Sequence, residues 1–155
     1  MRFRNEPRRA TCGFPTSFGS NYVKYISESL RSLPKSAIWF LSGSRRGGKN
    51  HGLRVRSGGR NAAQQITDPT DLGAQTRQAL ENLEIAVRAG GGTRTDIVSL
   101  RLYIVGDHIH NARSVREALL AFFPAENLPT STWIGVSALA SKDFLIEIEA
   151  VAVLE

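Results

Sequence analysis

The segment from Phe144 to Val153 alternates between apolar and other side chains with the period of a β-strand. Residues two apart share one face of a strand, so Glu147 and Glu149 lie together on one face, whereas Ile146 and Ile148 lie on the other. A carboxylate among apolar neighbours needs a cationic partner, an interface or a solvent-filled cleft, because burying an unpaired charge is costly. The alternative is an edge strand with a solvated face. Any chemistry is therefore expected around Glu147.

Basic and acidic residues are divided unevenly along the 155-residue chain. Residues 1–60 hold thirteen Lys and Arg and two acids, a net charge of +11, whereas residues 61–155 hold seven and twelve, a net charge of −5. Residues 43–60 contain six glycines and six basic residues, a composition that is not expected to form a packed element by itself. We predict a flexible basic tail at residues 1–20 and a single domain at residues 21–155, with an atypical Arg/Gly-rich loop at residues 44–63.

Three explanations of this basic region remain open. It could bind nucleic acid by neutralising phosphates, which would be independent of sequence and sensitive to salt. It could include a targeting segment, since the first 36 residues are rich in arginine and poor in acids. It could also be a solvated loop without a partner.

The rest of the chain shows clear helical and strand periods. A helix is predicted from Asp68 as N-cap, with Pro69 in its first turn, to the three glycines at 90–92. The further predicted elements are a strand at 96–105 with Val98 on its apolar face, a helix at 108–123, and strands at 132–139 and 144–153. Two earlier strands are predicted at 22–25 and 37–41.

This order of elements predicts an α+β, two-layer fold, in which two helices cover one face of a mixed sheet. The other face of such a sheet is apolar in part and must be covered, and self-association is a natural solution.

The residue inventory argues against several classes of site. One cysteine, Cys12, excludes an internal disulfide, and three scattered histidines give no metal-ligand spacing, so neither a metal nor another cofactor is expected. No apolar run approaches the roughly 20 residues that cross a bilayer. We expect a soluble, cytoplasmic protein without a membrane partner.

Three segments in order resemble one known family: DLGAQTRQALENLEIAVRAGGGTRTDIVSLRLYIV, a second helix, and PTSTWIGVSALASKDFLIEIEAVAV. The chain is similar over residues 66–153 to the Rid (YjgF/YER057c/UK114) family. The resemblance implies a chorismate-mutase-like fold, a homotrimer and a small-molecule ligand in each intersubunit cleft. Because the charge anomaly ends where the family pattern resumes, an altered reading frame over residues 44–63 is a fourth explanation of the basic region.

The resemblance also assigns site residues. In the deaminase branch, a strand arginine binds the carboxylate of an enamine or imine and a glutamate positions the attacking water. Glu147 matches the glutamate, Ser131 occupies the arginine position, and Ser42-Gly43 matches the start of a Ser-Gly-Gln loop. The resemblance therefore implies an arginine-less member outside the established imine-deaminase branch.

A serine hydroxyl has one donor and no charge, so it cannot replace a guanidinium in binding a carboxylate. Arg101 or Arg116 could supply the missing cation, or the ligand could lack a carboxylate. Trp133, on the face of Ser131, either shapes the cleft or packs in the trimer interface.

Two functional classes follow from these residues. As an enzyme, the protein would hydrolyse a small enamine or imine, with Glu147 positioning water. As a binding module, it would be a non-catalytic trimer that binds a small ligand or RNA, in line with the family's older endoribonuclease label.

Overall fold

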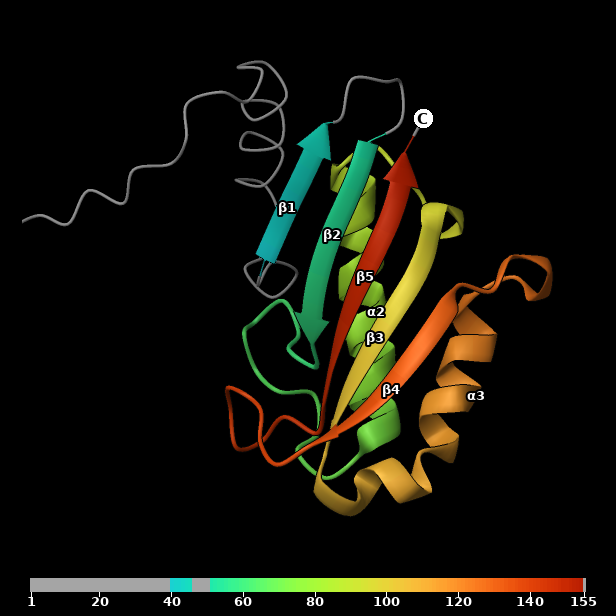
Figure 1. Cartoon of the computed structure of the whole chain (residues 1–155). Coiled ribbons are helices and arrows are strands. Elements are labelled where there is room, and N and C mark those ends of the chain that lie inside the picture. The colour runs from blue at the N-terminus through green and yellow to red at the C-terminus, as the bar shows by residue number, and fades with distance from the viewer. Residues whose placement is uncertain (1–39, 46–50, 155) are drawn as a thin grey trace, which may run out of the picture.

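The computed structural model describes residues 40–45 and 51–154 (Figure 1). The predicted tail at residues 1–20 and the predicted strand at 22–25 lie outside the described residues. The strands are β1 (Phe40–Arg45), β2 (His51–Gly58), β3 (Ile97–Val105), β4 (Thr130–Val136) and β5 (Ile146–Leu154). The helices are α2 (Leu72–Ala89) and α3 (Arg113–Phe122), with short 3-10 turns at Arg94–Asp96, Gly106–Asn111 and Ala125–Asn127.

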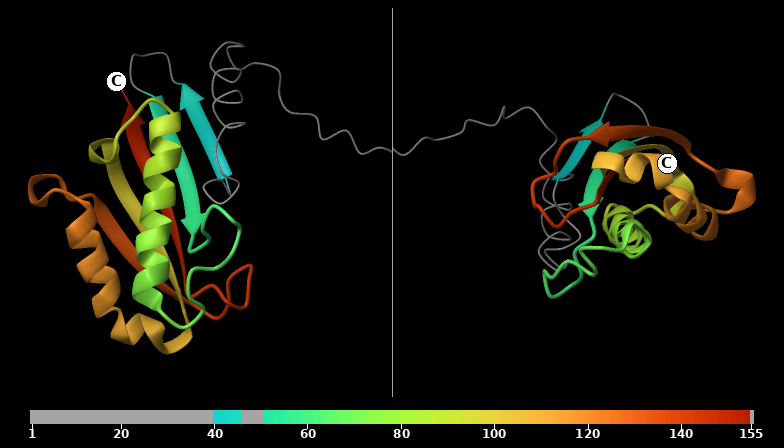
Figure 2. Two further views of the ribbon diagram at one scale, coloured as in Figure 1. Left: turned by 180° about the vertical axis from the view of Figure 1, so that it is seen from behind. Right: turned by 90° about the horizontal axis from the view of Figure 1, so that it is seen from below.

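The five strands form one mixed sheet in the order β1-β2-β5-β3-β4. β3 and β4 are parallel and are joined through α3, whereas the other neighbours are antiparallel. Both helices lie on the same face of the sheet, as the rear view and the view from below show (Figure 2). The predicted α+β fold, a mixed sheet with two helices on one face, is therefore confirmed.

The predicted Arg/Gly-rich loop at residues 44–63 is wrong over β2. This strand lies inside the sheet between β1 and β5. Leu53, Val55 and Ser57 are buried on its helix-facing side, and Arg54 and Arg56 alternate with them on the other side. The glycines and arginines obscure a period-two pattern, whereas the altered reading frame, which rests on the charge distribution of residues 44–63, stays a hypothesis.

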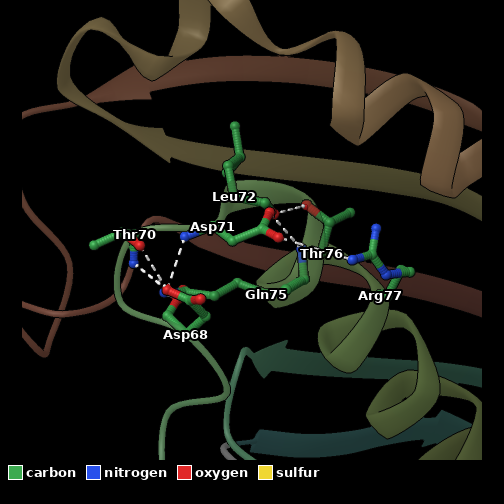
Figure 3. A network of polar contacts seen from close by, with 8 residues as sticks. Asp68, Thr70, Asp71, Leu72, Gln75, Thr76 and Arg77 are labelled. Carbon is green, nitrogen blue, oxygen red and sulfur yellow. Dashed lines mark hydrogen bonds and ion pairs between the residues drawn. The ribbon is translucent and has the colours of Figure 1, made fainter.

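The start of α2 differs from the prediction by three residues. Asp71, not Asp68, is the N-cap, and its carboxylate accepts a hydrogen bond from the Ala74 amide at 2.9 Å. Asp68 instead closes the preceding turn by accepting from the Thr70 amide and hydroxyl, each at 2.7 Å (Figure 3). The backbone hydrogen bond from Thr70 is the main reason why the pKa of Asp68 lies below its ordinary value.

The apolar face of β3 is interrupted near its start. A register irregularity between Ile97 and Ser99 places Ile97 in the core and leaves Val98 46% exposed. The prediction that Val98 shares the core face with Leu100 is therefore wrong.

Other element boundaries shift by a few residues. The predicted helix at 108–123 begins with the 3-10 turn Gly106–Asn111, and regular α-helix covers only Arg113–Phe122. The strands predicted at 132–139 and 144–153 are observed at 130–136 and 146–154, and the strand predicted at 37–41 is observed at 40–45.

A single apolar core fills the space between the sheet and the helices. Leu80, Leu83 and Val87 of α2 pack there with residues of β2, β3 and β5. The second face of the sheet has no helix over it in the part of the chain that the structure describes, and this bare face carries the charged residues of β2, β3 and β5.

Candidate functional site

Glu147 and Glu149 lie on the bare face of the sheet, as the alternation of β5 predicted. Glu147 is paired in register with Gly58 of β2 and with Tyr103 of β3. Glu149 is paired with Arg56 on one side and Arg101 on the other. The two carboxylates are central in the sheet and are not on an edge strand, so the solvated-edge alternative is excluded.

Glu149 is surrounded by arginines. Its carboxylate lies 3.1 Å from the Arg101 guanidinium, 3.4 Å from that of Arg56 and 3.7 Å from that of Arg54. Glu149 is only 5% exposed, so these cations compensate a buried charge. Glu149 is thus a member of a structural ion-pair cluster on the bare face.

Glu147 has fewer charge partners and is half-buried. The Nε atom of Arg56 lies 3.4 Å from its carboxylate. Burial raises the pKa of the Glu147 carboxyl above its ordinary value, the Arg56 charge opposes this rise, and the charge of Glu149 adds to it. A carboxylate whose pKa is raised toward neutrality is better suited to exchanging protons with a substrate.

The Ser-Gly pair that lies near Glu147 is not the one that the sequence suggested. Ser42 and Gly43 lie on β1, where they are paired with Arg54 and Leu53, and β2 separates them from β5. Ser57-Gly58 at the end of β2 lies beside Glu147 instead. The sequence does not indicate this second Ser-Gly pair, because the composition of residues 44–63 predicts a loop there.

Two buried amide side chains of α2 hold the segments next to Glu147. Asn82 donates from Nδ2 to the carbonyl oxygens of Gly58, at 3.2 Å, and Arg60, at 2.8 Å. Gln75 donates to the carbonyl oxygen of Asp143 at 2.9 Å and accepts from the Leu145 amide at 2.9 Å. The end of β2 and the approach to β5 are thereby fixed to the same helix.

Gln75 and Asn82 were not among the predicted site residues. The sequence gives one indication of them: each is a polar residue on the core-facing side of an otherwise regular amphipathic helix. Both side chains are almost fully buried, at 0% and 1% exposure.

Three predicted site residues meet in a pocket between β4 and α3. Ser131 and Trp133 are paired in register with the core residues Leu100 and Leu102, so they lie on the helix side of the sheet. The Trp133 Nε1 atom donates to the Ser131 hydroxyl at 3.2 Å. With Arg116 of α3, these residues line a pocket of about 240 Å³.

The predicted site residues thus form two groups on opposite faces of the sheet. Arg101 shares the bare face with Glu147, although its guanidinium binds Glu149. Arg116, Ser131 and Trp133 line the pocket on the helix side. Within one chain, the glutamate and the position of the family arginine do not converge on one ligand.

In residues 40–45 and 51–154, no three His, Cys, Asp or Glu side chains are grouped in a way that could hold a metal ion. Among the same residues, no helix has both the length and the apolarity needed to cross a membrane.

A mixed five-stranded sheet with two helices on one face, and with glutamates on the other, defines the protein as a two-layer α+β domain (Figure 2). The family model described as Endoribonuclease L-PSP matches residues 49–154, which include β2 and both groups of site residues. The chain therefore belongs to this family, which is the YjgF/Rid family. The match begins after Ser42-Gly43 and includes Ser57-Gly58.

Individual relatives agree with this assignment. The 2-iminobutanoate/2-iminopropanoate deaminase of Escherichia coli K12 is 36% identical over 87 residues, which are 55% of this chain and 66% of the relative. A RutC family protein of Pyrococcus horikoshii is 34% identical over 85 residues, which are 55% and 64% of the two chains. The chain thus spans slightly less than two thirds of the length of these curated relatives.

Solved structures show the same fold. A Rid-family protein of unknown function from Yersinia pestis is 36% identical, with a TM-score of 0.59 over 65% of this chain and 78% of that chain. TdcF of E. coli, solved with bound serine, is 26% identical, with a TM-score of 0.61 over 75% of this chain and 88% of that chain.

Proposed function

We propose that the protein hydrolyses a small imine, with Glu147 as the group that activates water. The observation that carries this proposal is the half-buried Glu147 carboxyl, whose pKa is raised by burial and which lies beside Gly58 on the bare face. The deaminase activity named for the E. coli relative supports the reaction class.

The proposed chemistry needs no cofactor. The Glu147 carboxylate accepts a proton from water while the water oxygen attacks the imine carbon, and the imine nitrogen takes a proton from solvent as its C=N π bond breaks. A carbinolamine forms. Glu147 then gives its proton to the amine nitrogen, the C–N bond breaks, and ammonia leaves as the hydroxyl returns a proton to solvent to form the oxo product. An enamine substrate would first become an imine by protonation at carbon.

We also propose that the complete site lies between two copies of the chain in a homotrimer. Glu147 and Gly58 on the bare face of one copy would meet the pocket of Arg116, Ser131 and Trp133 on a neighbouring copy. The reason is geometric, because the sheet itself separates these two half-sites within one chain.

The substitution Glu147→Gln tests the proposed chemistry. It removes the proton acceptor with little change in volume, so we expect the rate of oxo-acid formation from oxidase-generated imines to fall about 100-fold or more. Glu84→Gln, on the outer part of α2 where Glu84 pairs with Arg88, is the matched control and should retain the rate. If wild type gives no rate above buffer, or if Glu147→Gln equals wild type, the protein is a non-catalytic ligand-binding member of the family.

A further inference from the structure

We propose that the Arg116 guanidinium binds the carboxylate of the ligand, and that the apolar substituent of the same ligand fills the pocket between β4 and α3. This inference rests on the proposed function for the identity of the reacting group. The binding step itself is independent of hydrolysis and can be measured without it.

The pocket is mainly apolar but contains a few polar groups. Its lining is apolar except for one cation, one hydroxyl and the indole N–H of Trp133. The apolar lining residues are Leu100, Leu119, Leu120, Phe123, Leu128 and Pro129. Two of them, Leu120 and Leu128, are 52% and 51% exposed and line the same pocket, so they offer accessible apolar surface to a ligand.

Arg116 differs from its neighbouring arginines in having no partner for its side chain among the residues that the structure describes. Other arginines near α3 are occupied: Arg113 pairs with Glu117 at 2.8 Å, and Arg94 donates to the carbonyl oxygen of Phe122 at 3.0 Å. Arg116 has neither an ion pair nor a side-chain hydrogen bond to any residue that the structure describes. Its guanidinium is free to form a two-pronged hydrogen bond with an incoming carboxylate.

Ser131 and Trp133 are hydrogen-bonded to each other at the wall of the pocket. The Ser131 hydroxyl accepts a hydrogen bond from the Trp133 indole, which leaves its own proton free to donate. This hydroxyl and the Arg116 guanidinium line one pocket, so a carboxylate could receive both a charged and a neutral hydrogen bond. The cation that the family places on the strand is here supplied by the helix.

These features define a class of ligand. One free cation suits a monoanion, whereas a dicarboxylate would leave a second charge among apolar side chains. A volume of about 240 Å³ is below the roughly 300 to 1,000 Å³ of pockets for drug-sized ligands. The pocket therefore fits a 2-imino or 2-oxo monocarboxylate with a branched aliphatic side chain of a few carbons.

The test is the affinity of the full-length protein for 4-methyl-2-oxopentanoate, measured by calorimetry. We expect Arg116→Ala to weaken binding about 10-fold or more, because the loss of a hydrogen bond between charged groups raises a dissociation constant by about one to two orders of magnitude. Arg116→Lys should retain part of the affinity. Arg113→Ala, on the same helix but outside the pocket lining, is the matched control and should bind as wild type does.

Two further measurements separate this inference from the proposed reaction. Glu147→Gln should lose imine hydrolysis, whereas Arg116→Ala should weaken oxo-acid binding by the same factor in the Glu147→Gln background as in wild type. The methyl ester of the oxo acid should bind weakly, with no further loss in Arg116→Ala. The inference is overturned if wild type does not bind the oxo acid, if Arg116→Ala binds it as tightly as wild type, or if Arg113→Ala weakens binding equally.

Discussion

Glu147 and Glu149 are two residues apart on the same strand but have different electrostatic surroundings. Three arginines lie within 3.7 Å of the Glu149 carboxylate, whereas among the residues that the structure describes Arg56 is the one cation paired with Glu147. Two residues that look equivalent in the sequence therefore have different charge surroundings, and the difference comes from Arg54 of β2 and Arg101 of β3. The sequence predicts the shared face but not the arginines, because its Arg/Gly-rich composition hides the strand that supplies two of them.

Arg56→Met is expected to raise the pKa of Glu147 further, because it removes the cation that opposes the effect of burial. The acid limb of the pH–rate profile should then move to higher pH, since Glu147 must be deprotonated to accept a proton. Arg54→Met, which removes a partner of Glu149 but not of Glu147, is the control and should leave that limb in place. An unchanged limb in Arg56→Met would show that Glu147 does not control the rate.

The same raised pKa affects stability in a defined direction. In the pH interval above the ordinary value of 4.5 and up to the raised folded-state value, the native protein binds more protons at Glu147 than the unfolded chain does. The contribution of Glu147 to the free energy of unfolding is therefore greatest at acid pH. It decreases as the pH rises through this interval.

At the scale of elements, α2 determines where the ends of β2 and β5 lie. Gln75 makes hydrogen bonds to Asp68, Asp143 and Leu145 through one buried amide group. This connection joins residues about 70 positions apart along the chain, so it forms only when the tertiary fold is complete. It fixes the chain directly before the strand that carries Glu147.

Gln75→Leu should lower the free energy of unfolding by about 2 to 4 kcal/mol, because the partner groups on the backbone would remain buried without hydrogen bonds. Chemical denaturation of the purified protein measures the change. Gln78→Leu is the matched control, since Gln78 is more exposed on the same helix and its hydrogen bonds go to the side chains of Thr67, Glu81 and Asn82, not to buried backbone groups. Equal losses in the two variants would contradict the role assigned to Gln75.

The elements that were predicted well have simple periodicity. The buried stripe of α2 and the alternation of β5 are visible in the sequence because each has one consistent face. β2 was missed because Gly58 and the arginines outweighed the alternation of Leu53 and Val55. The exposure of Val98 could not be foreseen, because a β-bulge depends on pairing with a distant strand.

At the scale of the whole molecule, the sheet divides the candidate site into two half-sites. Glu147 and the pocket of Ser131 and Trp133 are on opposite faces, so neither half-site contains all the groups that the proposed reaction needs. The sequence indicated both sets of residues through the family resemblance. It could not show their separation, because the face on which a residue lies depends on the register between strands.

Mixed oligomers should therefore recover activity that the separate variants lack. Glu147→Gln removes one half-site, and Ser131→Trp fills the pocket of the other. Co-expressed chains should form some sites from two intact halves, and oxo-acid formation should exceed the sum of the two variants alone. Chains that carry both substitutions are the control. If co-expression recovers nothing while both variants assemble and fold, the proposal of a site shared between copies is wrong.

The unpaired charge of Arg116 affects how activity should be inferred for related chains. An inspection that scores position 131 alone would class this protein as lacking its anion-binding group. A single guanidinium satisfies one carboxylate, and a second in the same small pocket would repel the first. On the proposal that Arg116 binds the carboxylate, positions 116 and 131 are alternative locations for one charge, and they are best judged as a pair when catalytic competence is assigned from sequence.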